Sequence, residues 1–121
     1  MKRTLFLLAT CGAAVATFFA LAPFAGARPA AQTATTVRVT AKDFKFILSR
    51  KSAPHGKVTF IVTNKGPAKH DFKIAGKKTP LLKKNAKSSF TVTLRKGRKY
   101  TYICTVPGHA ALGMKGTFRA T

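Results

Sequence analysis

Short segments in which apolar and polar residues alternate fill the chain from Val37 to its C-terminus, and this pattern limits the possible folds most strongly. Val58–Thr63 is a β-branched and aromatic segment that ends at Asn64-Lys65-Gly66-Pro67. The other alternating apolar positions are Val37, Val39 and Ala41, then Phe44, Phe46 and Leu48, then Phe72 and Ile74, then Phe90, Val92 and Leu94, then Tyr100, Tyr102 and Cys104. A last short strand is expected over residues 115–120. Gly, Pro and Asn turns between such segments predict an all-β, antiparallel sandwich or barrel.

Helical periodicity is not evident in this region, although the long basic connection over residues 77–87 has room for a turn of helix. The alternating region is long enough for one domain with a small core. A bound metal ion would add useful stability to a core of that size.

The N-terminal segment departs from this pattern and is typical of a secretory signal peptide. Lys2 and Arg3 precede an uncharged run over residues 4–27, which ends in the small residues Ala25-Gly26-Ala27. Cleavage after Ala27 would leave residues 28–121. An uncleaved anchor is the alternative, because the 24 uncharged residues exceed the roughly 20 that a membrane span needs.

These features predict the domain organisation and the location of the protein. Residues 1–27 are expected to be the signal peptide or anchor, residues 28–36 a flexible linker, and residues 37–121 the folded domain. The protein is therefore expected to be exported, to the periplasm or the extracellular space. It would be tethered to the membrane if the anchor is kept.

The charge of the chain is extreme. Residues 28–121 keep 21 Lys and Arg against only Asp43 and Asp71, a formal net charge of +19. Such a surface attracts polyanions, anionic lipid headgroups or an acidic protein. Nucleic acid is not the expected partner, because the basic residues are spread along the whole chain and export removes most nucleic acids. A soluble basic surface without a dedicated partner is an equally open interpretation.

Cys104 is the one cysteine of residues 28–121, since Cys11 lies in the expected signal peptide. It cannot form an internal disulfide, and a free thiol outside the cytoplasm is open to oxidation unless it is buried or bound. Cys104 starts the spacing Cys-x4-His-x4-Met, which continues through His109 to Met114, and His70 follows a turn upstream. A loop between two strands can bring such donors together at one end of a sandwich.

A thiolate, two imidazoles and a weak thioether are the ligands of blue-copper electron-transfer sites. Zinc is the rival metal, because Cys and His bind it well, but structural zinc sites are built from Cys and His rather than Met. Each residue alone has an ordinary explanation in the core or at the surface. Together they predict a site for one copper ion. The third histidine, His55, is interpreted as a turn residue.

The segment from Tyr102 through Cys104-Thr105-Val106-Pro107-Gly108-His109 to Met114 resembles the ligand loop of the cupredoxins, the plastocyanin/azurin-type blue copper proteins. Its spacing is most similar to that of auracyanin and rusticyanin. The segments Asn64-Lys65-Gly66 and His70-Asp71-Phe72 resemble the region of the family's first histidine. The resemblance covers residues 37–121 and implies a Greek-key β-sandwich of about seven or eight strands.

The resemblance also implies roles for single residues. The implied copper ligands are His70, Cys104, His109 and Met114. The backbone N–H of Asp71 is expected to reach the ligand sulfur and its side chain to contact Thr105. The family often has Asn there, and the added negative charge should favour Cu(II) and lower the reduction potential. His109 is the implied exit for electrons, within a rim of Pro107, Ala110, Ala111 and Leu112.

The first hypothesis for function is a type 1 (blue) copper protein that carries one electron at a time outside the cytoplasmic membrane. The second is an exported copper-binding or copper-delivery protein. An enzyme with Cys104 as nucleophile is not expected, because the sequence supplies no orienting acid or oxyanion loop and Met114 would have no role. The expected partner is a redox protein, with an acidic protein or an anionic membrane surface as candidates, and the protein is expected to be a monomer.

Overall fold

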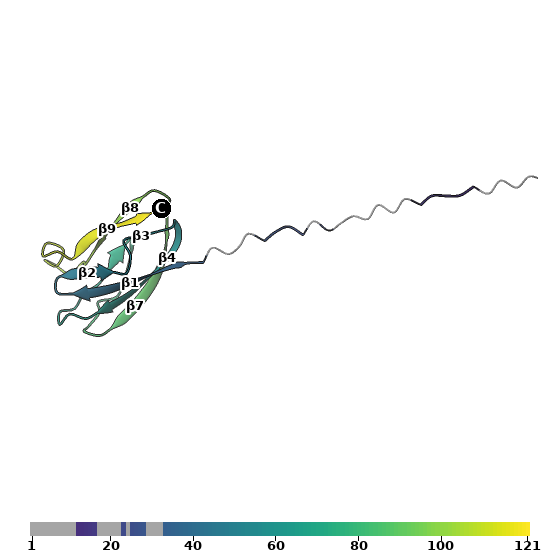
Figure 1. Cartoon of the computed structure of the whole chain (residues 1–121). Coiled ribbons are helices and arrows are strands. Elements are labelled where there is room, and N and C mark those ends of the chain that lie inside the picture. Colours follow the sequence, from purple (N-terminus) through teal and green to yellow (C-terminus); the bar gives the residue numbers. More distant parts are fainter. Residues whose placement is uncertain (1–11, 17–22, 24, 29–32) are drawn as a thin grey trace, which may run out of the picture.

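A computed structural model describes residues 12–16, 23, 25–28 and 33–121, and the last of these ranges contains the folded domain (Figure 1). Most of the predicted signal peptide lies outside the described residues, as does part of the predicted linker. Among the described residues there is no helix of the length and apolar character that a membrane span requires.

Nine strands form two sheets within residues 33–121, which confirms the all-β prediction (Figure 1). The strands are β1 (Thr35–Lys42), β2 (Lys45–Leu48), β3 (Ser52–Ala53), β4 (Gly56–Asn64), β5 (Lys73–Ile74), β6 (Lys77–Lys78), β7 (Lys87–Leu94), β8 (Lys99–Ile103) and β9 (Lys115–Ala120). The first sheet has the order β2-β1-β4-β7, and the second has the order β3-β9-β8-β5-β6. The two sheets pack face to face as a sandwich.

Two pairs of strands are parallel, which differs from the antiparallel arrangement predicted from the sequence. β1 pairs with β4, with Val37 opposite Phe60, and β3 pairs with β9. The cause is the path of the chain. Between β2 and β4 it crosses to the second sheet as β3 and then returns, so β4 enters the first sheet in the same direction as β1. Alternation along a strand specifies its buried face but not the direction of its neighbour.

The alternating apolar residues fill the space between the sheets. On β1, for example, Val37 and Val39 are buried while Arg38 between them is exposed. The centre of the core is aromatic, because the ring centroid of Phe60 lies 5.4 Å from that of Phe72 and 5.3 Å from that of Phe118. Burial of these rings stabilises the sandwich, and their contacts help to hold the sheets together.

Two local expectations from the sequence differ from the structure. Phe44 does not continue the strand pattern of Phe46 and Leu48 but lies in the turn between β1 and β2, where it is 37% exposed. Residues 77–87 contain no helical turn; they contain β6 and an isolated bridge between Leu82 and His70. The backbone of Leu82 pairs with His70, and this antiparallel bridge requires extended backbone there.

The turn between β1 and β2 and the loop between β8 and β9 lie at the same end of the sandwich, on the left in Figure 1. β1 begins at the opposite end. The sandwich therefore brings loops from both sheets together at the end away from the start of β1.

β1 begins at Thr35, two residues before the predicted start of the domain at Val37.

Candidate metal centre

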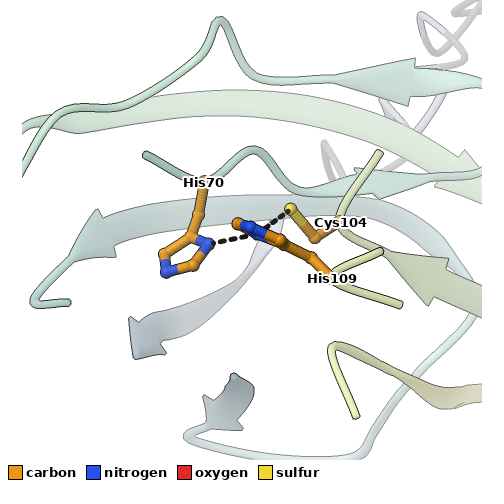
Figure 2. A group of neighbouring side chains, drawn as sticks. All are labelled: His70, Cys104 and His109. Atoms are coloured by element: carbon orange, nitrogen blue, oxygen red, sulfur yellow. Dashed lines mark hydrogen bonds between the residues drawn. The ribbon is translucent and has the colours of Figure 1, made fainter. Parts of the chain in front are cut away.

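Three side chains that bind metals meet at this end of the sandwich. The Nδ1 atoms of His70 and His109 lie 3.0 Å apart, and Nδ1 of His109 lies 3.7 Å from Sγ of Cys104 (Figure 2). One donor atom from each residue lies within 4.8 Å of the other two. His70 precedes β5, Cys104 follows β8, and His109 lies in the β8–β9 loop, so the fold itself assembles the group.

Hydrogen bonds fix His70 in place. Its N–H donates to the carbonyl of Leu82 at 3.1 Å, and its carbonyl accepts from the N–H of Leu82 at 2.8 Å. Asn64, buried at the end of β4, donates from Nδ2 to the carbonyls of Ala68 and Leu82 at 2.7 and 2.8 Å. Its Oδ1 accepts from the N–H of Gly66 at 2.9 Å. Asn64 therefore ties the loop that precedes His70 to the segment that pairs with it.

The β8–β9 loop is closed by backbone hydrogen bonds. The N–H of Cys104 donates to the carbonyl of Met114 at 3.0 Å, and the N–H of Met114 donates to the carbonyl of His109 at 3.1 Å. Gly108 and Gly113 have φ values of 83° and 124°, in the left-handed region that favours glycine. These two residues let a short loop turn back on itself, so Cys104, His109 and Met114 are held on one compact turn.

Cys104 is buried, with 1% of its surface exposed. Burial raises the pKa of the Cys104 thiol above its usual value. Backbone hydrogen bonds from Asp71 and Val106 lower this pKa in part, whereas the negative charge of Asp71 raises it further. A bound cation would stabilise the thiolate in such surroundings, because a metal ion supplies the missing positive charge.

Asp71 connects the His70 segment to the Cys104 segment. Its Oδ1 accepts from the backbone N–H of Thr105 at 2.6 Å, and its Oδ2 accepts from the Thr105 hydroxyl. The exposed Nζ of Lys78 lies 3.8 Å from Oδ2 and adds a weak ion pair. Because Asp71 follows His70 and Thr105 follows Cys104, these contacts hold the two segments at a fixed separation.

Met114 is completely buried beside Cys104. The two side chains pack with Ala41, and the partly buried Phe46 and Val106 complete this small apolar cluster. The cluster is separate from the main core, although Phe46 packs against both. Met114 is therefore held in a dry environment next to the thiol.

His109 lies where the group reaches the surface. It is half-buried, and its ring packs edge-on against Phe44 with the centroids 5.0 Å apart. The rim residues predicted from the sequence are all at least partly exposed: Pro107, Ala110, Ala111 and Leu112. Leu112 is the most prominent, with 62% of its surface exposed. Phe44 adds a large apolar side chain to this rim.

The donor atoms fit a single metal ion. Bonds of about 2.0 Å to nitrogen and about 2.3 Å to sulfur allow two nitrogen donors to lie up to about 4 Å apart and a nitrogen and a sulfur up to about 4.3 Å apart. The His70–His109 and His109–Cys104 separations of 3.0 and 3.7 Å lie within these limits, and the donor atoms of His70 and Cys104 lie within 4.8 Å of each other. A buried thiol beside imidazoles suits copper and excludes metals that prefer oxygen ligands, such as magnesium and calcium.

The sequence did not reveal every residue at the site. Oδ1 of Asp43 lies 2.6 Å from Nε2 of His70, and Phe44 packs against both histidines. One signal was available for Asp43, since it is one of only two acidic residues in the chain. His55 lies apart from the group, in the bend between β3 and β4, with its Nδ1 3.0 Å from the carbonyl oxygen of Thr121.

A two-sheet sandwich with two imidazoles and a buried thiol gathered at one end defines a small all-β metal-binding protein. The chain belongs to the family of the cupredoxin-like domain, whose model matches residues 11–117. Family membership and the His-Cys-His group together support one copper ion as the cofactor. No curated protein matches the sequence significantly.

Solved structures of auracyanins have the same fold. The dithionite-reduced auracyanin of the photosynthetic bacterium Roseiflexus castenholzii is 21% identical, with a TM-score of 0.63 over 73% of this chain and 98% of that one. Auracyanin B is 23% identical, with a TM-score of 0.61 over 73% and 89%. Auracyanin A, a "blue" copper protein of the green thermophilic photosynthetic bacterium Chloroflexus aurantiacus, is 21% identical, with a TM-score of 0.61 over 74% and 100%. These likenesses confirm the cupredoxin fold.

Proposed function

We propose that the protein is a type 1 copper protein that carries one electron at a time, with His70, Cys104, His109 and Met114 as the copper ligands. One observation carries the proposal: two imidazole nitrogens and a buried thiol sulfur lie within 4.8 Å of one another at one end of a cupredoxin fold. Copper bound there would alternate between Cu(I) and Cu(II). The role is that of a carrier rather than an enzyme.

The rigidity of the site supports electron transfer. Backbone hydrogen bonds fix His70, and the β8–β9 ladder anchors both ends of the loop that bears Cys104, His109 and Met114. Residues held in this way keep their positions when the charge of the metal changes. A small structural change on electron transfer lowers the barrier to it, so a preorganised frame favours fast exchange.

The half-buried His109 and its apolar rim offer a short route for electrons to the surface. A basic row of lysines lies beside the same site. Across the second sheet, Lys73 pairs with Ile103 and Ile103 pairs with Lys115, while Lys78 pairs with Lys73. We call the exposed residues Lys73, Lys78 and Lys115 the lysine row. Because Ile103 directly precedes Cys104, the lysine row would attract an acidic redox partner toward the site.

The proposed location is outside the cytoplasmic membrane, as the N-terminal sequence predicts, either free or tethered. A thiol that is buried and bound to a metal would be protected from the oxidising conditions found there. The protein is proposed to act as a monomer.

The test is addition of one equivalent of Cu(II) to the purified metal-free protein without oxygen. An intense visible absorption is expected, because a thiolate bound to Cu(II) gives strong charge transfer. Cys104→Ser should abolish it, and His70→Ala and His109→Ala should abolish or greatly weaken it. His55→Ala is the matched control and should keep the wild-type spectrum. A colourless wild-type protein that retains only zinc would overturn the proposal.

A second measurement separates a carrier from a copper-delivery protein. A carrier must hold both oxidation states, so copper should remain bound through repeated cycles of reduction and reoxidation. Transfer of Cu(I) to a competing chelator should also be slow. Rapid loss of Cu(I) to a mild chelator would assign the protein to copper delivery.

A further inference from the structure

We propose that Asp43 is a positioning residue of the metal centre, which fixes the ring of His70 and places a negative charge against it. The inference rests on the proposed function and adds to it a residue from the turn that joins two strands of the first sheet. Asp43 lies in the turn between β1 and β2, and its Oδ1 lies 2.6 Å from Nε2 of His70. The side chain of His70 is completely buried, whereas that of Asp43 is 25% exposed.

The contact determines which nitrogen of His70 faces the metal. A carboxylate accepts hydrogen bonds, so the Nε2 of His70 must carry the proton in this pair. Nδ1 of the neutral ring then presents its lone pair, and Nδ1 is the atom that lies 3.0 Å from Nδ1 of His109. A histidine that donates its second N–H to a carboxylate is held in one tautomer and one orientation and becomes a stronger ligand.

The structure makes room for this contact. A Cβ atom added at Gly66 would collide with Oδ1 of Asp43 and would lie 3.1 Å from Nε2 of His70. The absence of a side chain at Gly66 is therefore what allows the carboxylate to reach the ring. Gly66 is itself held by the hydrogen bond from its N–H to Oδ1 of Asn64. The loop that contains Gly66 and the carboxylate of Asp43 therefore pack closely against each other.

The composition of the chain supports a specific role for Asp43. The sequence contains 23 Lys and Arg but only two acidic residues, Asp43 and Asp71. Both lie at the candidate metal centre: Asp43 contacts His70, and Asp71 contacts Thr105 beside Cys104. A carboxylate kept only for solubility or for surface ion pairs would not be confined to one end of so basic a domain. Near the metal it would stabilise the higher positive charge of Cu(II) over Cu(I).

Two substitutions at Asp43 separate its geometric and electrostatic effects. Asp43→Asn keeps an acceptor oxygen but removes the charge, so the reduction potential should rise while His70 stays in the same tautomer. Asp43→Ala removes both, so the potential should rise, and copper should bind about 10–100-fold more weakly, as is typical when the partner of a ligating histidine is lost. Thr93→Lys is the control: it changes the net charge as Asp43→Asn does, but it lies on β7 near the opposite end of the sandwich. It should leave the potential nearly unchanged.

Nitrogen NMR of the His70 ring in the metal-free protein gives a readout that needs no copper. Wild-type and Asp43→Asn proteins should show a proton on Nε2 alone, whereas Asp43→Ala should show a mixture of tautomers. If the tautomer of Asp43→Ala and the potentials of both variants match those of Thr93→Lys, the inference is wrong while the copper assignment stands. If wild-type protein binds no copper but shows the predicted tautomer and its loss in Asp43→Ala, the proposed function fails while the positioning role stands.

Discussion

Gly66→Ala is a sharp test of how closely the loop before His70 is fitted to the β1–β2 turn. The new methyl group would collide with Oδ1 of Asp43 and lie 3.0 Å from the backbone N of Asp43. The Asp43 side chain is partly exposed and can rotate toward solvent, whereas His70 is fixed by its backbone bridge to Leu82. The carboxylate is therefore the group that should move, and the hydrogen bond to His70 should break.

The magnitude follows from what that movement leaves behind. Every buried side-chain nitrogen and oxygen atom in the described residues has a hydrogen-bond partner. Without the carboxylate, Nε2–H of His70 would be buried and unpaired, which costs about 1–3 kcal/mol. For a domain of this size each kcal/mol corresponds to a fall of about 4–8 °C in Tm. Gly66→Ala should therefore destabilise the metal-free protein by this amount.

The assay is a double-mutant cycle measured by urea unfolding of the metal-free protein. Asp43→Ala leaves His70 unpaired on its own, so Gly66→Ala should cost much less in that background. The coupling energy should be about 1–3 kcal/mol, well above the ~0.5 kcal/mol expected for independent sites. Gly116→Ala is the control, since its methyl group would collide with the ring of Tyr102 instead. It should destabilise the protein without coupling to Asp43→Ala.

Additive effects of Gly66→Ala and Asp43→Ala would refute the reasoning, because they would show that the methyl group and the carboxylate do not compete for space. An increase in stability on Gly66→Ala would refute it as well. A change in the m-value of either variant would indicate an altered unfolded state, and its free energies would then be compared through refolding and unfolding rates.

Three further predictions address the metal and its electron exchange. Met114→Leu should retain copper and raise the reduction potential, measured by redox titration of the visible band, because loss of a weak axial donor disfavours Cu(II) more than Cu(I). Oxidation of the reduced protein by the hexacyanoferrate(III) anion should slow as salt rises. Lys73→Glu should slow it more than Lys57→Glu, which makes the same charge change at the far end of the sandwich; equal stopped-flow rates in these two variants would make the lysine row irrelevant to encounter. His109→Gly should slow electron exchange, and added imidazole should restore it in part; no effect of imidazole would argue against His109 as the exit.

Much of the fold could be predicted from the sequence, because each strand's buried face depends on its own alternation. β9 over residues 115–120 was predicted with its observed limits, and β4 was predicted to within a few residues. The parallel pairing of β1 with β4 could not be predicted in this way. It depends on the route of the chain through the second sheet, and no local pattern encodes that route.

At the candidate site, too, local features could be predicted from the sequence and contacts between distant segments could not. Cys104, His109 and Met114 share one loop, so their spacing was visible, and the structure brings Cys104 and His109 together with His70. Asp43 and Phe44 were missed because they reach His70 from another sheet, 27 residues away along the chain in the case of Asp43. Phe44 also fitted the alternation of β2 and was assigned to it. Contacts of this kind form only when the fold brings two loops together. The periodicity of a single sequence does not predict which loops will meet.

The distribution of charge allows the choice of partner and the reduction potential to be determined by different groups of residues. The basic surface acts at long range, and dissolved ions screen it over about 10 Å at 0.1 M ionic strength. It can therefore affect the approach of a charged partner while contributing little to the energy of a metal ion at the proposed site. Asp43 and Asp71 act at short range, Asp43 against the buried ring of His70 and Asp71, itself buried, against Thr105 beside Cys104, and Coulomb energies at such distances are larger and less screened by salt. Because the two carboxylates lie at the site and the basic residues are spread along the chain, substitutions of lysines remote from the site could change the choice of partner while the reduction potential stays nearly constant.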